Sequence, residues 1–325
     1  MITIYLTFYR HRFILLICLT GFLLRLWMAT ILPVTFDEAH NILLARSSVF
    51  PLKVAVANDY PPLYFTIWHL WQKLSQTVIW NRLLSVLMGT VAIALTYTTL
   101  KKMISNKVAV IATILTIITP GHIYYFSVAR MYAPAILLST LFCAGVLTYM
   151  KEKRLTVDFF LIILAGFYTH YFFSILFFLT LLWVIIYFHR NRIILTSWFT
   201  FCILMILFLT PLILEIIQVR PLIGVVTNPI LKFPAFYLTP LLPWDMVQQL
   251  PILNTASIDT MSILALALAL ISCGFLLIIL IQLPRLKELH PLACAFFTTP
   301  VVVYILVRLG LPIAGLRAFA IFFPC

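Results

Sequence analysis

Two adjacent carboxylates follow the first long apolar stretch of the chain. Asp37 and Glu38 lie in residues 34–40, where Thr35 followed three residues later by Glu38 forms a capping-box pattern. This pattern predicts a helix start at which the Glu38 side chain reaches back to the Thr35 amide. Asp37 has no such local role, and His40 lies one turn away from it. Asp37 is therefore a candidate general base, while the alternative stays open that both carboxylates only complement the helix dipole.

Aromatic side chains continue the same polar connection. Tyr60 and Tyr64 flank a Pro-Pro pair that fixes an extended entry into a helix predicted at about residues 62–75. This helix is too short to span a bilayer and is rich in aromatic residues, so we expect it to lie at the membrane interface with its tryptophans as anchors. Tyr60 and Tyr64 are candidates for contacts with a sugar or a lipid headgroup.

Five further side chains on the same side of the membrane are candidates for binding a substrate: Arg25, Arg130, His170 and Arg317 for an anionic group, and Tyr132 for a sugar. Arginine binds carboxylates and phosphates through planar, charge-assisted hydrogen bonds. Arg25 lies inside the first apolar stretch, roughly 10 Å below its outer end, where a charge requires a partner. For Arg130 the alternative is snorkelling to headgroups, and for His170 it is a hydrogen-bonded packing role.

The composition requires a membrane around these residues. Of 325 residues, 64% are hydrophobic and only 10% are charged, which is too little polar surface for a protein in water. A disordered chain, a disulfide-rich secreted domain and a soluble nucleotide-binding enzyme are excluded. The net charge of +13 would suggest nucleic acid in a soluble protein, but here it flanks apolar stretches, and we expect no nucleic-acid partner.

The hydrophobic stretches predict a single all-α transmembrane domain over residues 1–325 with about ten spans. The predicted spans are residues 12–32, 79–100, 107–121, 131–150, 156–170, 172–188, 193–216, 261–283, 291–309 and a last one that opens near 314. Because that last stretch is cut off at Cys325, we expect either a partial helix or a longer natural chain.

Lysine and arginine set the predicted orientation, because they concentrate in cytoplasmic loops. The basic clusters are Arg10/Arg12, Lys101/Lys102/Lys107, Lys151/Lys153/Arg154, Arg190/Arg192 and Arg285/Lys287. All five fall on one side when ten spans are threaded, so the N-terminus is predicted to be cytoplasmic. The two long connections, residues 33–78 and 217–260, then lie outside the cell or in the periplasm, together with the candidate site residues.

Four motifs in this order resemble the GT-C superfamily of polytopic membrane glycosyltransferases, and in particular the bacterial relatives of protein O-mannosyltransferases and aminoarabinose-lipid A transferases. The motifs are Asp37-Glu38, Tyr60-Pro61-Pro62-Leu63-Tyr64, Tyr124-Tyr125 with Ala129-Arg130-Met131-Tyr132-Ala133, and Thr169-His170-Tyr171-Phe172. The resemblance covers roughly residues 20–190, and Gly315-Leu316-Arg317 is similar to a late arginine in these chains.

The resemblance implies a GT-C-like helix bundle in the cell (inner) membrane, with a polyprenyl-phosphate-linked sugar as donor and a lipid, glycan or protein as acceptor. It places the catalytic carboxylate in the first outer loop, at Asp37. Because a polyprenyl phosphate leaves as a stable anion, one carboxylate suffices, and we expect inversion at the anomeric carbon. The other candidates would bind substrate: Glu38, His40, Tyr60, Tyr64, Arg130, Tyr132, His170, Arg25 and Arg317.

Other classes of function fit part of the sequence. Without a DxD pattern in the outer loops we expect no cofactor, although Asp37, Glu38 and His40 offer ligands for a divalent cation. A transporter or flippase of a lipid-linked sugar would also need buried arginines, but it predicts an inverted repeat and broken helices near the midplane, which the sequence does not display. A non-catalytic envelope assembly protein and an enzyme similar to O-antigen ligases are further alternatives.

Overall fold

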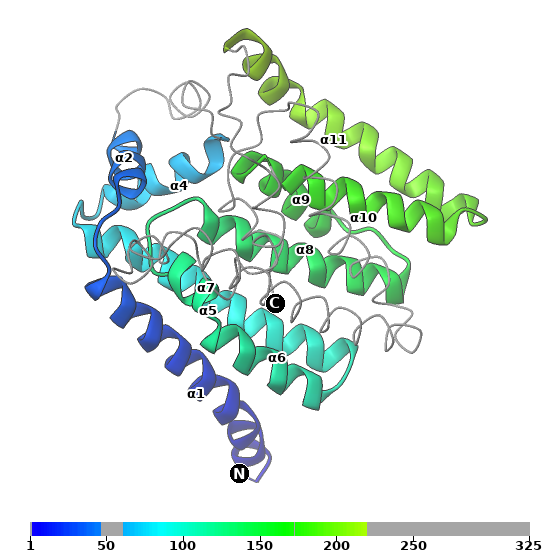
Figure 1. Cartoon of the computed structure of the whole chain (residues 1–325). Helices are drawn as coiled ribbons and strands as arrows, with labels where there is room; N and C mark the ends of the chain where they lie inside the picture. The colour runs from blue at the N-terminus through cyan, green and yellow to red at the C-terminus, as the bar shows by residue number, and fades with distance from the viewer. Residues whose placement is uncertain (1, 47–60, 172, 220–325) are drawn as a thin grey trace, which may run out of the picture. The chain divides into compact units, whose positions relative to one another are not determined.

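The computed structural model describes residues 2–46, 61–171 and 173–219, and every regular element in these ranges is an α-helix (Figure 1). The chain divides into two compact units, with the boundary between Ala144 and Gly145, inside one helix. Described residues before this boundary form unit 1, and those after it form unit 2. The candidate carboxylates and most of the candidate arginines belong to unit 1.

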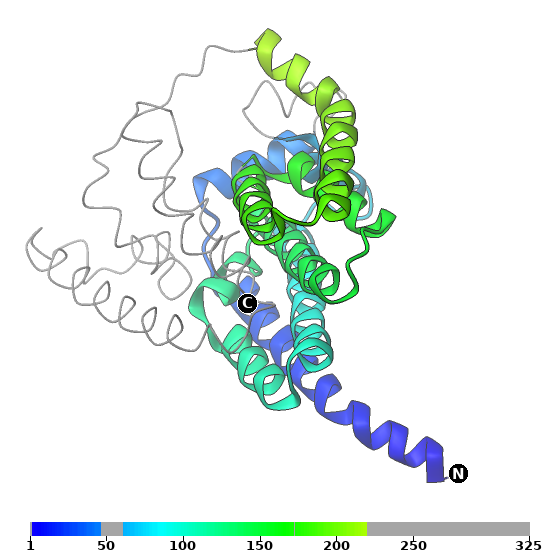
Figure 2. The same cartoon turned by 90° about the vertical axis from the view of Figure 1, so that its right-hand side faces the viewer.

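Among the residues that the structure describes, unit 1 consists of two long helices, four shorter ones and the first part of another. Its elements are α1 (Ile2–Ile31), α2 (Phe36–Ala45), α4 (Pro62–Gln72), α5 (Val78–Met103), α6 (Asn106–Ile118), α7 (Pro120–Tyr125) and the first part of α8 (Tyr132–Glu152). Helices α1, α5 and α6 lie side by side, and the N-terminal part of α1 extends beyond its neighbours (Figure 1, Figure 2). Helices α2 and α4 pack on each other.

Two glycines allow α1 and α5 to approach closely. A Cβ atom at Gly21 of α1 would lie 2.3 Å from the side chain of Ile93, and one at Gly89 of α5 would lie 2.7 Å from the ring of Phe126. Real Cβ contacts are not that short, so a side chain at position 21 would displace the end of Ile93, and one at position 89 would displace the Phe126 ring. Small residues at helix interfaces are the usual way in which membrane helices pack backbone against backbone.

Local sequence signals set where the short helices begin. The predicted N-cap of α2 is confirmed, because the Thr35 hydroxyl accepts the Glu38 amide at 3.3 Å. The predicted helix after the prolines is confirmed as α4, which starts at Pro62 and ends at Gln72, earlier than expected. Its Trp68 is fully buried in unit 1 and therefore is not the interfacial anchor that the sequence suggested.

A reciprocal tryptophan pair joins α4 to α5. The indole rings of Trp71 and Trp80 stack at 4.6 Å, and each indole N–H donates to the backbone carbonyl of the other residue, at 2.8 and 3.0 Å. Next to them, the Gln72 amide donates to Asn81 Oδ1 at 2.7 Å. These bonds close the corner between the two helices and fix the direction in which α5 enters the unit.

Unit 2 contains the rest of α8 and three further helices: α9 (Val157–Thr169), α10 (Phe173–Phe188) and α11 (Arg192–Val219). Its described core is aromatic. Trp198 of α11 is buried and packs edge-on against Tyr149 and Phe159, with ring centroids at 5.4 and 6.2 Å. Edge-to-face contacts of this kind add to the burial of the rings themselves.

In the described part of the chain, four helices are long and apolar enough to cross a membrane, which indicates a membrane protein. They run over Arg12–Ile31, Val78–Met103, Tyr132–Glu152 and Arg192–Leu214. Three other predicted spans correspond to shorter apolar helices, α6, α9 and α10. The predicted span 107–121 ends early because Pro120 cannot continue α6. The last three predicted spans and the loop 217–260 lie mostly or wholly outside the described residues, so the ten-helix bundle stays a prediction.

Candidate active site

The first turn of α2 sends its two carboxylates in different directions. Asp37 and Glu38 are adjacent on the helix, so their side chains are separated by about 100° around its axis. The half-exposed Asp37 lies beside Arg130, whereas Glu38 is fully buried beside Arg82. The expected return of Glu38 to the Thr35 amide is wrong, because the side chain instead reaches an arginine that is 44 residues away in sequence.

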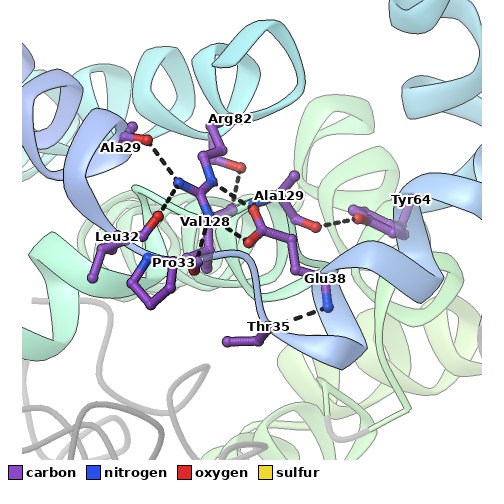
Figure 3. Close-up of polar contacts among 10 residues, drawn as sticks. Ala29, Leu32, Pro33, Thr35, Glu38, Tyr64, Arg82, Val128 and Ala129 are labelled. Atoms are coloured by element: carbon purple, nitrogen blue, oxygen red, sulfur yellow. Dashed lines mark hydrogen bonds and ion pairs between the residues drawn. The ribbon is translucent and has the colours of Figure 1, made fainter. Parts of the chain in front are cut away.

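The Glu38–Arg82 ion pair is bidentate. Arg82 Nε donates to Glu38 Oε1 at 2.8 Å and Nη2 donates to Oε2 at 2.6 Å, so the planar fork of the guanidinium matches the carboxylate (Figure 3). Both side chains are buried, at 2% and 0% exposed. A charge can be held this deep only because its partner and further hydrogen bonds replace water.

The remaining donors of Arg82 bind the end of α1. Nη1 donates to the carbonyls of Ala29 and Leu32 at 2.7 and 2.8 Å, and Nη2 donates to the carbonyl of Pro33 at 3.1 Å (Figure 3). All five N–H groups of the guanidinium are thereby used. The carbonyls at a helix C-terminus lack intrahelical partners, so Arg82 satisfies them while it joins α1, α2 and α5.

The segment that leads from α7 to α8 is fixed by side chains from three other helices. Glu38 Oε1 also accepts the Ala129 amide at 2.8 Å, and the Tyr64 hydroxyl donates to the Ala129 carbonyl at 2.9 Å (Figure 3). Ser85, one turn after Arg82 on α5, donates to the carbonyl of Val128 at 2.8 Å. The backbone immediately before Arg130 is therefore held on both sides.

Arg130 and Asp37 form the second ion pair of the site. Arg130 Nη1 lies 2.9 Å from Asp37 Oδ2, and the exposed fractions of the two side chains are 6% and 37%. The guanidinium carbon lies 5.3 Å from the ring centroid of Tyr132. Burial alone would lower the pKa of Arg130, but Tyr132 and the charge and hydrogen bond of Asp37 together raise this pKa above its ordinary value. The guanidinium therefore stays charged.

This second pair retains capacity for a ligand. Arg130 Nε is buried and donates to no group among the residues that the structure describes. The Asp37 carboxylate reaches the surface, so a hydroxyl or amine can approach it. A carboxylate that can accept a proton thus lies next to a cation with an unused donor, which is an arrangement suited to deprotonating one group while an anionic group is bound.

Arg25 of α1 is fully buried, and its side chain contacts the end of α6, just before the break that separates α6 from α7. Its guanidinium donates to the carbonyls of Gly21 at 3.1 Å and Thr116 at 3.0 Å, and it lies 5.8 Å from the Phe126 ring centroid. Thr116 is four residues before Pro120, which has no N–H to donate to that carbonyl. Arg25 supplies the missing donor, which is the partner that its depth in the apolar stretch required.

Of the other candidate residues predicted from the sequence, those that the structure describes lie on different helices. His40 stacks on Phe36 at 6.3 Å on the outer face of α2, while Tyr64 is fully buried and bonded to the backbone. His170 is buried at the end of α9, where its amide donates to the carbonyl of Gly166 at 3.0 Å, and it belongs to unit 2. Tyr60 and Arg317 lie outside the described residues.

Sequence analysis missed the partner of Glu38. Arg82 lies inside the predicted span 79–100, and a charged residue inside a span normally pairs with an opposite charge or with carbonyls. That signal was present in the sequence, but it does not say which carboxylate is the partner. The three proposed cation ligands also do not converge: within the described ranges, no group of three or more His, Cys, Asp or Glu side chains is placed to hold a metal ion.

Comparisons of the chain with family models, with curated proteins and with solved structures find no match. Function is therefore inferred from the residues and their geometry.

Proposed function

We propose that this chain is an inverting membrane glycosyltransferase that uses a polyprenyl-phosphate-linked sugar as donor. The oxygen or nitrogen of the acceptor attacks the anomeric carbon, and the bond from that carbon to the phosphate oxygen breaks. The electron pair of that bond stays on the phosphate, and the acceptor proton moves to the Asp37 carboxylate. The products are the glycosylated acceptor and the polyprenyl phosphate.

One observation carries this proposal: the pairing of the half-exposed Asp37 with the buried Arg130 at 2.9 Å. A base toward the acceptor needs access from outside, and Asp37 has it. A departing phosphate needs a fixed positive charge with free donors, and Arg130 has a buried Nε that has no partner in the part of the chain that the structure describes. Because the phosphate leaves as a stable anion, the reaction requires no second carboxyl group as an acid.

The residues around Asp37 and Arg130 also support these catalytic roles, because they hold both side chains in fixed positions. Arg130 follows a backbone segment that Glu38, Tyr64 and Ser85 hold in place, and Asp37 is adjacent to Glu38 on α2. Catalytic groups need to be held close to their productive positions by a rigid surrounding shell. The buried Glu38–Arg82 pair thus positions both members of the exposed pair at once.

The membrane setting completes the proposal. Four helices long and apolar enough to cross a bilayer accompany the site. We place the chain in the cytoplasmic membrane as a multi-pass GT-C-like bundle with its N-terminus inside, and the site on the outer face, where a lipid-linked donor and a lipid, glycan or protein acceptor can meet. The orientation follows from the basic clusters in alternate loops.

Comparison of envelope lipids and glycans by mass spectrometry, with and without the gene, tests the reaction class and identifies the transferred mass. The Asp37→Asn variant should lose turnover by a factor of about 10²–10⁴, the usual contribution of a general base, while it accumulates in the membrane as the wild type does. Asp158→Asn, which changes an exposed carboxylate in the first turn of α9, is the matched control and should keep full activity.

Arg130→Gln should weaken binding of the lipid-phosphate donor more than it affects the acceptor. Near-normal turnover in Asp37→Asn would overturn the assignment of the base. An envelope with no mass difference between the two strains would overturn the reaction class.

A further inference from the structure

We propose that unit 2 carries a binding site for an acidic phospholipid, in a groove that begins at the N-terminus of α11. The phosphate of the headgroup would contact Arg192, and one acyl chain would lie along α11. This site is separate from the Asp37–Arg130 pair and does not depend on the proposed transferase activity.

The groove follows one face of α11. It has a volume of about 560 Å³ and is open to the outside. Residues spaced at helical intervals from Ile193 to Leu204 form its floor, with Phe201 at its base, and Leu155 from the connection between α8 and α9 forms one wall. Arg192 lies at one end and is the first residue of α11. The lining therefore changes from a cationic end to an apolar end.

The length of this face matches one leaflet of a bilayer. Ile193 and Leu204 are eleven residues apart, which corresponds to about 16 Å along a helix. The hydrocarbon core of a bilayer is about 30 Å thick, so one leaflet accounts for about half of that. A lipid with its headgroup at Arg192 would thus place one acyl chain along the whole groove and stop near the midplane.

The polar side chains in the groove are compatible with an acyl chain. Thr196 and Ser197 donate their hydroxyl groups to the carbonyls of Arg192 and Ile193, both at 2.9 Å. These hydroxyls are satisfied within the helix and require no partner from a ligand. Their carbon atoms, with those of Phe201 and Leu204, are available for contact with a hydrocarbon chain.

The cationic end of the groove is supported by two neighbouring connections. The Lys153 ammonium lies 4.5 Å from the Phe188 ring, and Leu155 and Arg192 share the groove, so the turns α8–α9 and α10–α11 lie beside each other. Their charged residues are all exposed: Lys151, Lys153, Arg154, Arg190 and Arg192 are basic, and Glu152 and Asp158 are acidic. The excess of positive charge favours an anionic headgroup, and α11 directs its positive dipole end there.

Lys153 is engaged by unit 2 itself. Its ammonium group donates to the Met150 carbonyl and lies over the Phe188 ring. Arg192 is therefore the basic residue that lines the groove.

Native mass spectrometry of the full-length protein, purified in detergent and offered equal amounts of phosphatidylglycerol and phosphatidylcholine, tests the proposal. The wild type should bind phosphatidylglycerol at least about fivefold more strongly, the effect expected for one basic side chain near an anionic headgroup. Arg192→Gln should remove this preference. Thr200→Trp, which fills the groove, should reduce the binding of both lipids.

The matched control is Lys107→Gln, which removes a basic residue from the α5–α6 turn of unit 1 and should keep the preference of the wild type. Each variant changes an exposed position, and unchanged thermal unfolding identifies it as folded. Equal binding of the two lipids by the wild type, or an unchanged preference in Arg192→Gln, would overturn the proposal. Displacement of phosphatidylglycerol by millimolar inorganic phosphate would show a site for free anions and would also overturn it.

Discussion

Glu38 and Asp37 each bind an arginine, but the two ion pairs have opposite surroundings. Arg82 uses all five of its donors, on Glu38 and on three carbonyls, and neither side chain of this pair reaches solvent. Among the described residues, Arg130 Nε is a buried donor without a partner, and Asp37 is 37% exposed. Asp37 and Glu38 are neighbours on α2, yet one belongs to an ion pair that solvent reaches and the other to a buried pair in which every arginine donor is used.

This difference shows why adjacent carboxylates need not share a function. A buried pair with no spare hydrogen-bonding capacity can hold segments together, but it cannot exchange partners without a large cost. An accessible pair with a spare donor contributes less to stability and can bind a ligand. The sequence predicted a capping role for Glu38 and no such local role for Asp37, but the two arginines are what bury one carboxylate and leave the other accessible.

The largest expected difference between the two ion pairs is in how much each contributes to the free energy of unfolding. Glu38→Gln leaves Arg82 buried without a countercharge and should lower the free energy of unfolding by about 3–5 kcal/mol. Asp37→Asn should lower it by less, because Asp37 is 37% exposed and water can take the place of its carboxylate beside Arg130. Scanning fluorimetry or denaturant titration in detergent measures both. Equal losses in the two variants would contradict the division between a structural and an accessible pair.

A smaller effect should follow from displacing the segment that both pairs share. In Gly89→Ala the new methyl group would meet the ring of Phe126, which precedes Arg130 in the same segment. Overpacking of this kind costs about 1–3 kcal/mol, and turnover should fall as Arg130 moves relative to Asp37. Thr90→Ala, the next position on α5, is the control. An unchanged Tm and turnover in Gly89→Ala would show that the segment adapts freely.

The smallest effect should come from a neutral bond to the same segment. Tyr64→Phe removes the hydroxyl that donates to the Ala129 carbonyl and should cost about 0.5–1.5 kcal/mol, with a few-fold loss of turnover. Tyr97→Phe removes a hydroxyl at the other end of α5, where it donates to Asn106, and should change stability without changing turnover. If both variants lose the same turnover, Tyr64 has no special role in holding Arg130.

Local signals predicted the start of this site. The Thr35 N-cap is confirmed, and the Pro-Pro pair correctly placed the start of α4, because both depend on side chains and backbone within one helical turn. The predicted role of Trp68 was wrong for a related reason. Composition identifies an aromatic residue on a short helix, but whether that residue faces lipid or protein depends on what packs against the helix.

The arginines show the limit of the same reasoning. The depth of Arg25 in an apolar stretch correctly required a partner, but the partner is a carbonyl that Pro120 leaves without a donor, and this is visible only once α1 and α6 are side by side. Likewise, the position of Arg82 inside a predicted span indicates that it needs a partner, but the sequence does not identify Glu38 as that partner.

By itself, the sequence determined that the described chain is helical and apolar enough for a membrane, where α2 and α4 begin, and that Asp37 and Glu38 lie together on the first turn of α2. These properties depend on composition and on interactions within a few residues. Only the tertiary structure decided which carboxylate is buried and which is accessible. The groups that decide it, Arg82 and Ala129, are 44 and 91 residues from Glu38 in sequence, and helix packing alone brings them within hydrogen-bond distance.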